Sequence, residues 1–225
     1  MIDEKLLKYF EGYLTDNRKA LFKKILEDRT RHFTVVLEDI FQPHNASAVV
    51  RTCDIFGVQD VHAIENKYLN KVSRHVAKGS QKWITSKRYK CDGDNTQICL
   101  DALREKGYQI IATTPHNDSC LLQDFDVTKK SAFVFGVEAE GVSDYVKDNA
   151  DGFLKIPMVG FTESLNISVA AAIILQDVTT KLRMSGVEWQ LTKEEKEILY
   201  FSWVKKTIKN VDKIEEHYFQ NLKKE

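Results

Sequence analysis

Two short apolar runs constrain the fold of this chain more than any other feature. Residues 109–113 (Gln-Ile-Ile-Ala-Thr) and 131–135 (Ser-Ala-Phe-Val-Phe) are bounded by polar residues and are too short for helices. A strand with apolar residues on both faces needs cover on both faces, as in the parallel sheets of α/β proteins. Further strand-like runs at 34–37 and 61–64 alternate with helical patterns at 46–56 and 98–106. We therefore expect an α/β fold, with a mostly parallel sheet and helices on both faces.

The two ends of the chain have a different pattern, which is helical. Residues 1–32 carry apolar residues at helical spacing with a break at Asp16-Asn17, and helical patterns return at 191–207 and 211–222. At 225 residues, the chain is sized for one compact domain with short appendages. We therefore predict an N-terminal helical extension at 1–32, an α/β domain at 33–184 and a C-terminal helical extension at 185–225.

Composition excludes several classes of protein. No apolar run approaches the roughly 20 residues that span a bilayer, and the start of the chain lacks the basic-then-apolar order of a signal peptide. We therefore expect a cytoplasmic protein. The four cysteines form no CxxC pair, so we expect free thiols and no metal site.

Charge is balanced overall but unevenly distributed. The chain has 33 basic and 33 acidic residues, which argues against an indiscriminate binder of polyanions. However, residues 67–90 contain eight lysines and arginines and no acid, with Trp83 and Tyr89 among them. Such a stretch attracts phosphates locally even in a neutral protein. The alternative is an ordinary solvated surface, which is the usual meaning of a lysine-rich stretch.

A first polar segment follows the first predicted strand, where open α/β sheets bind ligands. It runs from Gln42 to Arg51, and within it Asn45 is suited to cap the next helix. Arg51 lies among apolar residues, where an arginine is costly to bury unless it meets an anion or a carboxylate. Taken alone, the pair also fits a helix cap and a structural ion pair.

A second segment runs from Phe135 to Ser143 and joins a strand to a helix that Ser143 can cap. Gly136 and Gly141 allow a tight turn that a Cβ would block. The turn lacks the GxGxxG spacing of dinucleotide-binding folds and the GxxxxGK[ST] of phosphate loops. It therefore disfavours a nicotinamide-dependent enzyme and a nucleotide triphosphatase.

The third segment, residues 156–172, is the most specific. A loop with Pro157 leads into Ser164-Leu165-Asn166 and then into a helix that starts with small residues. An ordinary core helix would have larger side chains at those positions, so the segment indicates a place where another group packs closely.

Together and in this order, the three segments resemble the motifs of the SPOUT superfamily, and specifically the TrmH-type tRNA and rRNA ribose 2′-O-methyltransferases. The resemblance extends from about Phe33 to Arg183. It implies a SPOUT fold with a C-terminal deep trefoil knot, a homodimer with sites near the subunit interface, S-adenosylmethionine as methyl donor and no metal. It also implies an RNA partner rather than DNA or a membrane. The helical extensions look like those of the enzymes that modify guanosine 18 in the D-loop of tRNA.

The resemblance also implies roles for individual residues. The catalytic set would be Asn45 and Arg51 from the first motif, Glu138 from the second, and Ser164 and Asn166 from the third. The donor would lie among Thr113, Gly136, Ile156, Met158 and Leu165. Basic residues expected to contact RNA are Arg18, Lys19, Lys82, Lys87, Arg88, Lys181 and Arg183. Because a guanidinium does not lose its proton readily, we expect Arg51 to stay charged, to hold a phosphate and to stabilise the developing alkoxide.

Two alternatives stay open at this point. An rRNA ribose methyltransferase commonly carries a folded RNA-binding domain before the catalytic one, whereas only about 32 residues precede Phe33, which favours tRNA. A noncatalytic RNA-binding relative would keep the fold and lose the reaction, but all five catalytic candidates are present. The tail from Trp203 to Glu225 departs from the usual pattern of the tRNA enzymes, which affects substrate docking more than catalysis.

Overall fold

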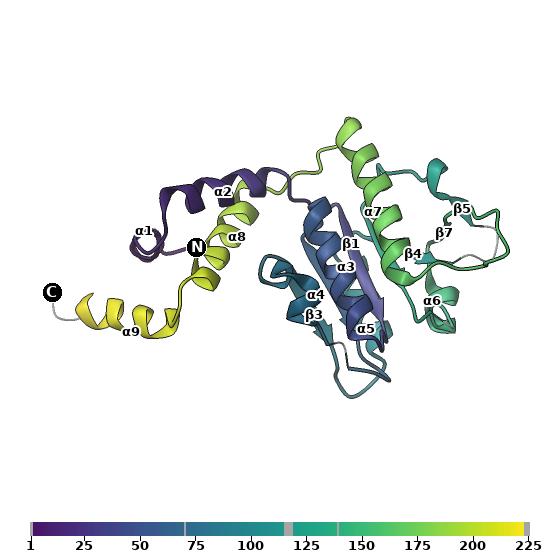
Figure 1. The fold of residues 1–225 in the computed structure, drawn as a ribbon, viewed down its shortest axis with the longest axis horizontal. Helices are drawn as coiled ribbons and strands as arrows, with labels where there is room; N and C mark the ends of the chain where they lie inside the picture. Colours follow the sequence, from purple (N-terminus) through teal and green to yellow (C-terminus); the bar gives the residue numbers. More distant parts are fainter. Residues whose placement is uncertain (1, 70, 115–118, 139, 223–225) are drawn as a thin grey trace. The chain divides into compact units, whose positions relative to one another are not determined.

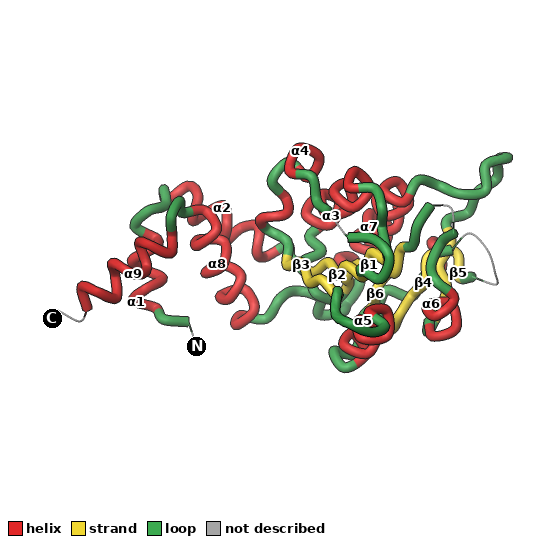
Figure 2. The backbone as a smooth tube through the Cα atoms, turned by 90° about the horizontal axis from the view of Figure 1, so that it is seen from below, coloured by secondary structure: helices red, strands yellow, loops and turns green. Residues whose placement is uncertain are grey.

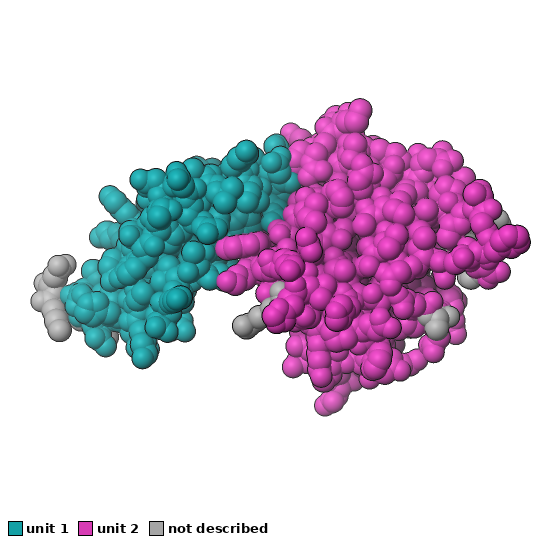
Figure 3. Space-filling view, in the orientation of Figure 1, with its two compact units in different colours: residues 1–29, 190–225 teal, residues 30–189 magenta. Residues whose placement is uncertain are grey.

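The computed structural model describes residues 2–69, 71–114, 119–138 and 140–222 (Figure 1). They form two compact units, which Figure 3 distinguishes by colour. The larger unit is residues 30–189, and the smaller combines residues 1–29 with residues 190–225.

The larger unit is built on a seven-stranded sheet with the order β3-β2-β1-β6-β4-β7-β5. Every recorded pairing between these strands is parallel. The strands are β1 (Phe33–Glu38), β2 (Asp60–Ile64), β3 (Thr85–Tyr89), β4 (Gln109–Thr113), β5 (Cys120–Leu121), β6 (Ser131–Phe135) and β7 (Gly152–Lys155). The prediction of a parallel α/β sheet is therefore confirmed, and the two runs that led to it, β4 and β6, are hydrogen-bonded neighbours in its interior.

Helices cover both faces of this sheet, as Figure 2 shows. α3 (Pro43–Phe56) and α7 (Ile167–Met184) pack together on one face, and α5 (Asn95–Arg104) and α6 (Asp144–Asn149) lie on the other. A short helix, α4 (Arg74–Ala77), and single 3₁₀ turns at Ser80–Lys82 and Leu122–Asp124 complete the unit among the described residues.

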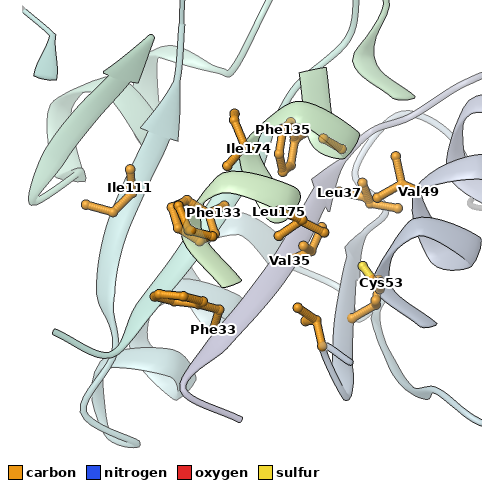
Figure 4. Packing of buried hydrophobic residues seen from close by; sticks show 14 of the residues in the cluster. Phe33, Val35, Leu37, Val49, Cys53, Ile111, Phe133, Phe135, Ile174 and Leu175 are labelled. Atoms are coloured by element: carbon orange, nitrogen blue, oxygen red, sulfur yellow. The ribbon is translucent and has the colours of Figure 1, made fainter. Parts of the chain in front are cut away.

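The core is divided between the two faces because successive strand residues point to opposite sides. Phe33, Val35 and Leu37 of β1 join the cluster under α3 and α7, whereas Val36 joins the cluster under α5 and α6. Figure 4 shows the first cluster, in which Ile174 and Leu175 of α7 pack over the sheet beside Phe133 and Phe135. Burial on both faces explains why the strand sequences are almost continuously apolar.

Three strands and one helix were absent from the sequence prediction. β3 has the sequence Thr-Ser-Lys-Arg-Tyr and lies at an edge of the sheet, where its first four residues are exposed. An exposed edge strand needs no apolar alternation, so its sequence carries little signal. β5, β7 and α4 are two to four residues long, which is too short for a periodic pattern. The knot implied by the resemblance stays a prediction.

The smaller unit consists of helices from both ends of the chain. It contains α1 (Glu4–Glu11), α2 (Asp16–Glu27), α8 (Lys193–Thr207) and α9 (Val211–Leu222). Phe10, Phe22 and Trp203 are buried within it, and Thr192 and Glu195 form a capping box at the start of α8. The helices of residues 1–29 and 190–225 thus pack together as one compact unit. No helix in the described part of the chain is long and apolar enough to cross a membrane.

His62 is a buried titratable group in the larger unit. It lies on β2 with a 4% exposed side chain, and its Nδ1 is 3.0 Å from the Tyr89 hydroxyl. Burial, reinforced by the positive charges of Lys106 and Lys87, lowers the pKa of His62 to about 4. In the unfolded chain the pKa would be about 6.5, so between these values only the unfolded chain binds the proton.

We therefore predict that acid destabilises the fold through His62. Between pH 7.5 and pH 4.5 the proton taken up on unfolding should lower the free energy of unfolding by about 2–3 kcal/mol. Urea unfolding at the two pH values measures this loss, and His62→Gln should show a loss smaller by that amount. His75→Gln, at an exposed position, is the matched control and should keep the wild-type pH dependence. An equal pH dependence in the His62 variant would contradict the prediction.

Candidate functional site

Three side chains from distant parts of the chain meet in one hydrogen-bonded cluster. Asn45 Nδ2 donates to Glu138 Oε1 at 3.0 Å, and Asn166 Nδ2 donates to Asn45 Oδ1 at 3.2 Å. Asn166 Nδ2 also donates to Glu138 Oε1. The cluster therefore joins residues from all three predicted motifs, which are 28 to 121 positions apart in the chain.

Asn45 has a different structural role from the one expected. It was predicted to cap α3, but the helix begins at Pro43 and its N-cap is Gln42, which makes no side-chain cap hydrogen bond. Proline favours the first helical position because its φ is already helical and it has no N–H to leave unpaired. The earlier start places Asn45 inside the first turn, 7% exposed, with its amide turned to Glu138 instead of its own backbone.

Asn166 has two roles. It is the N-cap of α7, and its Oδ1 accepts hydrogen bonds from the backbone N–H and the hydroxyl of Ser168 at 2.8 and 2.6 Å. Those bonds orient the amide so that its Nδ2 points to Asn45 and Glu138. The small residues at the start of α7 contribute here too, because Ala170 lines a cavity beside the cluster.

The turn that carries Glu138 is closed very tightly. A Cβ on Gly136 would lie 1.9 Å from the carbonyl oxygen of Gly141, and Gly141 has a φ of +71° that favours glycine. The Gly141 N–H donates to the Val137 carbonyl at 2.8 Å. Both glycines noted in the sequence are therefore required by the backbone of the turn.

A buried carboxylate at the end of β1 anchors this turn. Glu38, 4% exposed, accepts hydrogen bonds from the backbone N–H and hydroxyl of Ser143 at 2.8 and 2.7 Å, and from the Thr96 hydroxyl at 2.9 Å. Ser143 is also the N-cap of α6, as predicted. Sequence reasoning missed Glu38, although two successive acids, Glu38 and Asp39, at the end of an apolar strand were a usable signal.

A cavity of about 450 Å³, here called the first cavity, opens beside the cluster. The five residues predicted to surround the methyl donor all line it: Thr113, Gly136, Ile156, Met158 and Leu165. Glu138 and Ser164 line it as well, and Glu163 adds another carboxylate. The structure thus brings the donor candidates and two of the catalytic candidates to a single cavity.

A second cavity of about 320 Å³ adjoins the cluster. Its lining includes Asn45, Phe41, Gln42, Lys67 and Tyr68. The two cavities share the turn that carries Glu138 and also share Ile167. The cluster of Asn45, Glu138 and Asn166, which we call the amide cluster, therefore lies where the two cavities adjoin.

Arg51 is a predicted catalytic residue that the structure brings neither to the amide cluster nor to either cavity. It is exposed on α3 and lines neither cavity. Six residues after Asn45, it lies about 9 Å further along the helix at 1.5 Å per residue, on a different face.

The basic residues predicted to contact RNA fall into two groups. Arg18, Lys82 and Lys87 are exposed, and Lys87 lies 4.7 Å from the centre of the Tyr89 ring. The other four have polar partners in the protein, although Arg88 and Arg183 are exposed as well. Lys19 pairs with Asp16 at 2.6 Å, and Arg88 forms a two-pronged pair with Glu65 at 2.6 and 2.8 Å.

Lys181 and Arg183 near the end of α7 have structural partners. The Lys181 ammonium pairs with Asp177 at 2.6 Å and donates to the carbonyls of Leu122 and Gln123. Arg183 donates to the Phe56 carbonyl at 2.9 Å. Their prediction as RNA contacts stays a prediction. In the described residues, no group of histidine, cysteine or acidic side chains is arranged to hold a metal ion, and none of the four cysteines forms a disulfide.

Comparison with known proteins identifies the family. Residues 32–176 match the SpoU rRNA Methylase family. A tRNA (guanosine(18)-2′-O)-methyltransferase from Borreliella burgdorferi is 40% identical over 217 residues, covering 95% of this chain and 98% of the relative. The enzyme of the same name from Thermus thermophilus is 35% identical over 77% of this chain and 87% of its own length.

Solved structures agree with this assignment. The TrmH/SpoU tRNA modifying enzyme of A. aeolicus is 30% identical with a TM-score of 0.76, covering 87% of this chain and 98% of that one. The SpoU methyltransferase AviRb from Streptomyces viridochromogenes, in complex with AdoMet, shares the fold at 23% identity and a TM-score of 0.61, over 72% and 65% of the two chains. The chain therefore belongs to the SpoU methylase family.

Proposed function

We propose that this protein transfers a methyl group from S-adenosylmethionine to the ribose 2′-hydroxyl of guanosine 18 in the D-loop of tRNA, in the cytoplasm. The observation that carries the proposal is the meeting of Asn45, Glu138 and Asn166 beside a cavity lined by all five residues expected at the donor. The choice of tRNA rests on the relatives that share most of the chain and are named for that activity.

The first cavity fits the donor in size and chemistry. Its volume of about 450 Å³ lies within the range of small-molecule sites, about 300–1,000 Å³. Its walls combine apolar side chains such as Ile156 and Met158 with three carboxylates and two ammonium groups, which suit a ligand that carries both positive and negative charges; these are Glu138, Glu140, Glu163, Lys147 and Lys155. When bound there, S-adenosylmethionine supplies a methyl group on a positively charged sulfur, open to attack by an oxygen.

The amide cluster would position the ribose. Glu138 accepts hydrogen bonds from both Asn45 and Asn166, and this fixes the direction of both amides. Glu138 is thus a positioning residue that lines both cavities, with Asn45 in the lining of the second cavity and Ser164 in the lining of the first. Because the reaction needs an oxygen held in line with the methyl group, fixed geometry supplies much of the rate. The proton leaves to phosphate or solvent, since the guanidinium of Arg51 stays charged.

We infer that the protein acts as a homodimer in which Arg51 serves the site of the other subunit. α3 and α7 cover the same face of the sheet, and large apolar side chains are exposed on both: Ile55 at 65% on α3, and Val169 at 44%, Ile173 at 38% and Met184 at 82% on α7. Arg51 is four residues from Ile55, so both lie on one side of α3. Exposed apolar patches mark interaction sites, and in a two-fold dimer the same patch of each subunit forms the interface.

The proposal predicts that one ribose oxygen accepts the methyl group. Transcripts of a tRNA with guanosine 18, incubated with labelled S-adenosylmethionine, should gain about one methyl group each, and 2′-deoxyguanosine at position 18 should abolish labelling because the acceptor atom is gone. The deoxy transcript should still bind, because the phosphates that dominate affinity are unchanged.

Other outcomes of this experiment point to other functions. Labelling of rRNA fragments with none on tRNA indicates an rRNA ribose methyltransferase. Binding of tRNA with no labelling of any RNA, by protein that binds the donor, indicates a noncatalytic RNA-binding relative.

A further inference from the structure

The second cavity is not needed for the donor, yet it carries a well-defined set of exposed groups. Phe41 and Tyr68 line it with side chains 66% and 43% exposed, and their ring centres are 5.1 Å apart in an edge-to-face arrangement. Large exposed aromatic rings at the mouth of a cavity offer a surface on which an unstacked RNA base can lie.

Hydrogen bonds to Asp39 fix the backbone of the loop that carries Tyr68. The carboxylate of Asp39, 9% exposed, accepts hydrogen bonds from three successive backbone N–H groups, those of Asn66, Lys67 and Tyr68, at 2.8, 2.7 and 3.2 Å. Asp39 itself has a φ of +51°, a conformation that few non-glycine residues adopt. This wall of the cavity is therefore pre-organised, which lowers the entropic cost of binding there.

The charged groups of the second cavity leave one pair available to a ligand. The carboxylates of Glu38 and Asp39 are occupied by hydrogen bonds within the fold, and Glu138 holds the amide cluster. Lys67 and Glu140, by contrast, have side chains 69% and 76% exposed, and their charged atoms are 3.8 Å apart. This loose pair sets a hydrogen-bond donor beside an acceptor.

We propose that the second cavity binds the base of the target nucleotide and selects guanine through Lys67 and Glu140. Guanine presents an acceptor, O6, next to the N1–H and N2–H donors, so Lys67 donates to O6 while Glu140 accepts from the donors. Adenine presents the reverse order and is rejected. Four carboxylates in the lining, Glu38, Asp39, Glu138 and Glu140, make the cavity unfavourable for a phosphate.

This inference rests on the proposed function, because it places the parts of one nucleotide. A base in the second cavity sets its ribose at the amide cluster, since Asn45 and Glu138 line that cavity. Glu138 also lines the first cavity, so the ribose oxygen then faces the donor. Lys67 thus lines only the second cavity, whereas Glu140, like Glu138, lines both cavities, so base selection and methyl transfer adjoin at this turn.

The test combines altered bases with altered residues. Transcripts carry guanosine, inosine or 2-aminopurine riboside at position 18, so that inosine lacks the 2-amino group and 2-aminopurine lacks O6 and the N1–H. Each is assayed for kcat/KM with wild type, Lys67→Met and Glu140→Gln. We expect wild type to disfavour inosine by about tenfold, the equivalent of about 1.4 kcal/mol, as for one hydrogen bond to a charged group, and to disfavour 2-aminopurine more strongly because it loses a hydrogen bond to each of the two residues.

Each of the two variants should change the discrimination between guanosine and the analogues in a different way. Glu140→Gln should reduce the difference between guanosine and inosine, whereas Lys67→Met should leave that difference unchanged and reduce only the difference between guanosine and 2-aminopurine. Lys71→Met, which removes an exposed lysine of the same basic stretch outside both cavities, is the matched control and should affect all three transcripts equally. Phe41→Ala should raise KM for all three alike, because every base can stack.

Failure of this inference and failure of the proposed function give different results. Equal discrimination by wild type, Lys67→Met and Glu140→Gln, with methylation of the guanosine transcript intact, would remove base selection from the second cavity. Absence of methylation by wild type on any transcript would instead overturn the proposed function.

Discussion

Replacement of Arg51 by alanine is expected to lower kcat for tRNA methylation by about a hundredfold to a thousandfold, as for loss of a group that stabilises developing negative charge. Affinity for the donor should stay close to wild type, because Arg51 does not line the first cavity. Single-turnover rates with labelled S-adenosylmethionine measure the first quantity, and calorimetric titration with S-adenosylhomocysteine measures the second. Arg51→Lys, which keeps the charge and loses the planar fork, should retain part of the rate. A near-normal rate in the alanine variant would remove Arg51 from the reaction.

Mixed dimers test whether Arg51 acts across the subunit interface. Arg51→Ala and Asn45→Ala chains, co-expressed with different tags, give a dimer in which one site combines an intact amide cluster with the other subunit's Arg51. That dimer should have about half the wild-type activity, since one of two equivalent sites is complete, although each parent is inactive. No recovery in the purified mixed dimer would place Arg51 in the site of its own subunit or outside the site altogether.

Replacement of Gly136 by valine should weaken donor binding by about a hundredfold or more, equivalent to about 2.8 kcal/mol, because the turn that forms part of the first cavity cannot keep its shape. A Cβ at this position would lie 1.9 Å from the Gly141 carbonyl oxygen and 2.4 Å from the Val142 nitrogen, and both are backbone atoms that cannot move aside cheaply. The turn must therefore open, and it carries Glu138 and lines both cavities.

Calorimetric titration with S-adenosylhomocysteine measures this effect, and thermal unfolding followed by circular dichroism shows whether the variant folds. Gly136→Ala gives a milder version if the valine variant fails to fold. Gly186→Val is the matched control, because a Cβ there meets nothing within 4 Å. Wild-type affinity in a folded Gly136→Val protein would show that the turn can relax without disturbing the cavity.

The four central strands of the sheet, β2, β1, β6 and β4, were predicted from the sequence, and the strands on either side of them were not. The predicted runs 109–113 and 131–135 coincide with β4 and β6, because strands covered on both faces must be apolar almost throughout. β3 lies at an edge and has polar residues at its exposed positions, so it was seen only as part of a basic stretch. The apolar pattern of the sequence thus indicates which elements are buried, and elements with little buried surface have only a weak apolar pattern.

The site was predictable at the level of which segments meet, but less so at the level of single side chains. The motif order placed Asn45, Glu138 and Asn166 together, and their contacts agree. The hydrogen bonds that anchor the turn through Glu38 were missed because they depend on how β1 lies beside α6. The partners of Lys181 were missed for the same reason, since Leu122 and Gln123 are far from it in the chain. Spacing within a segment says nothing about such long-range partners.

The turn between β6 and α6 separates the first cavity from the second and forms part of the wall of each. Val137, Glu138 and Val142 are among the residues that form part of both cavity walls. Binding on one side therefore changes the surface offered on the other, and such coupling is reciprocal: if the donor tightens RNA binding by some factor, RNA tightens donor binding by the same factor. Dissociation of one product would then weaken the binding of the other. The methylated RNA and S-adenosylhomocysteine would therefore leave the enzyme cooperatively after each turnover.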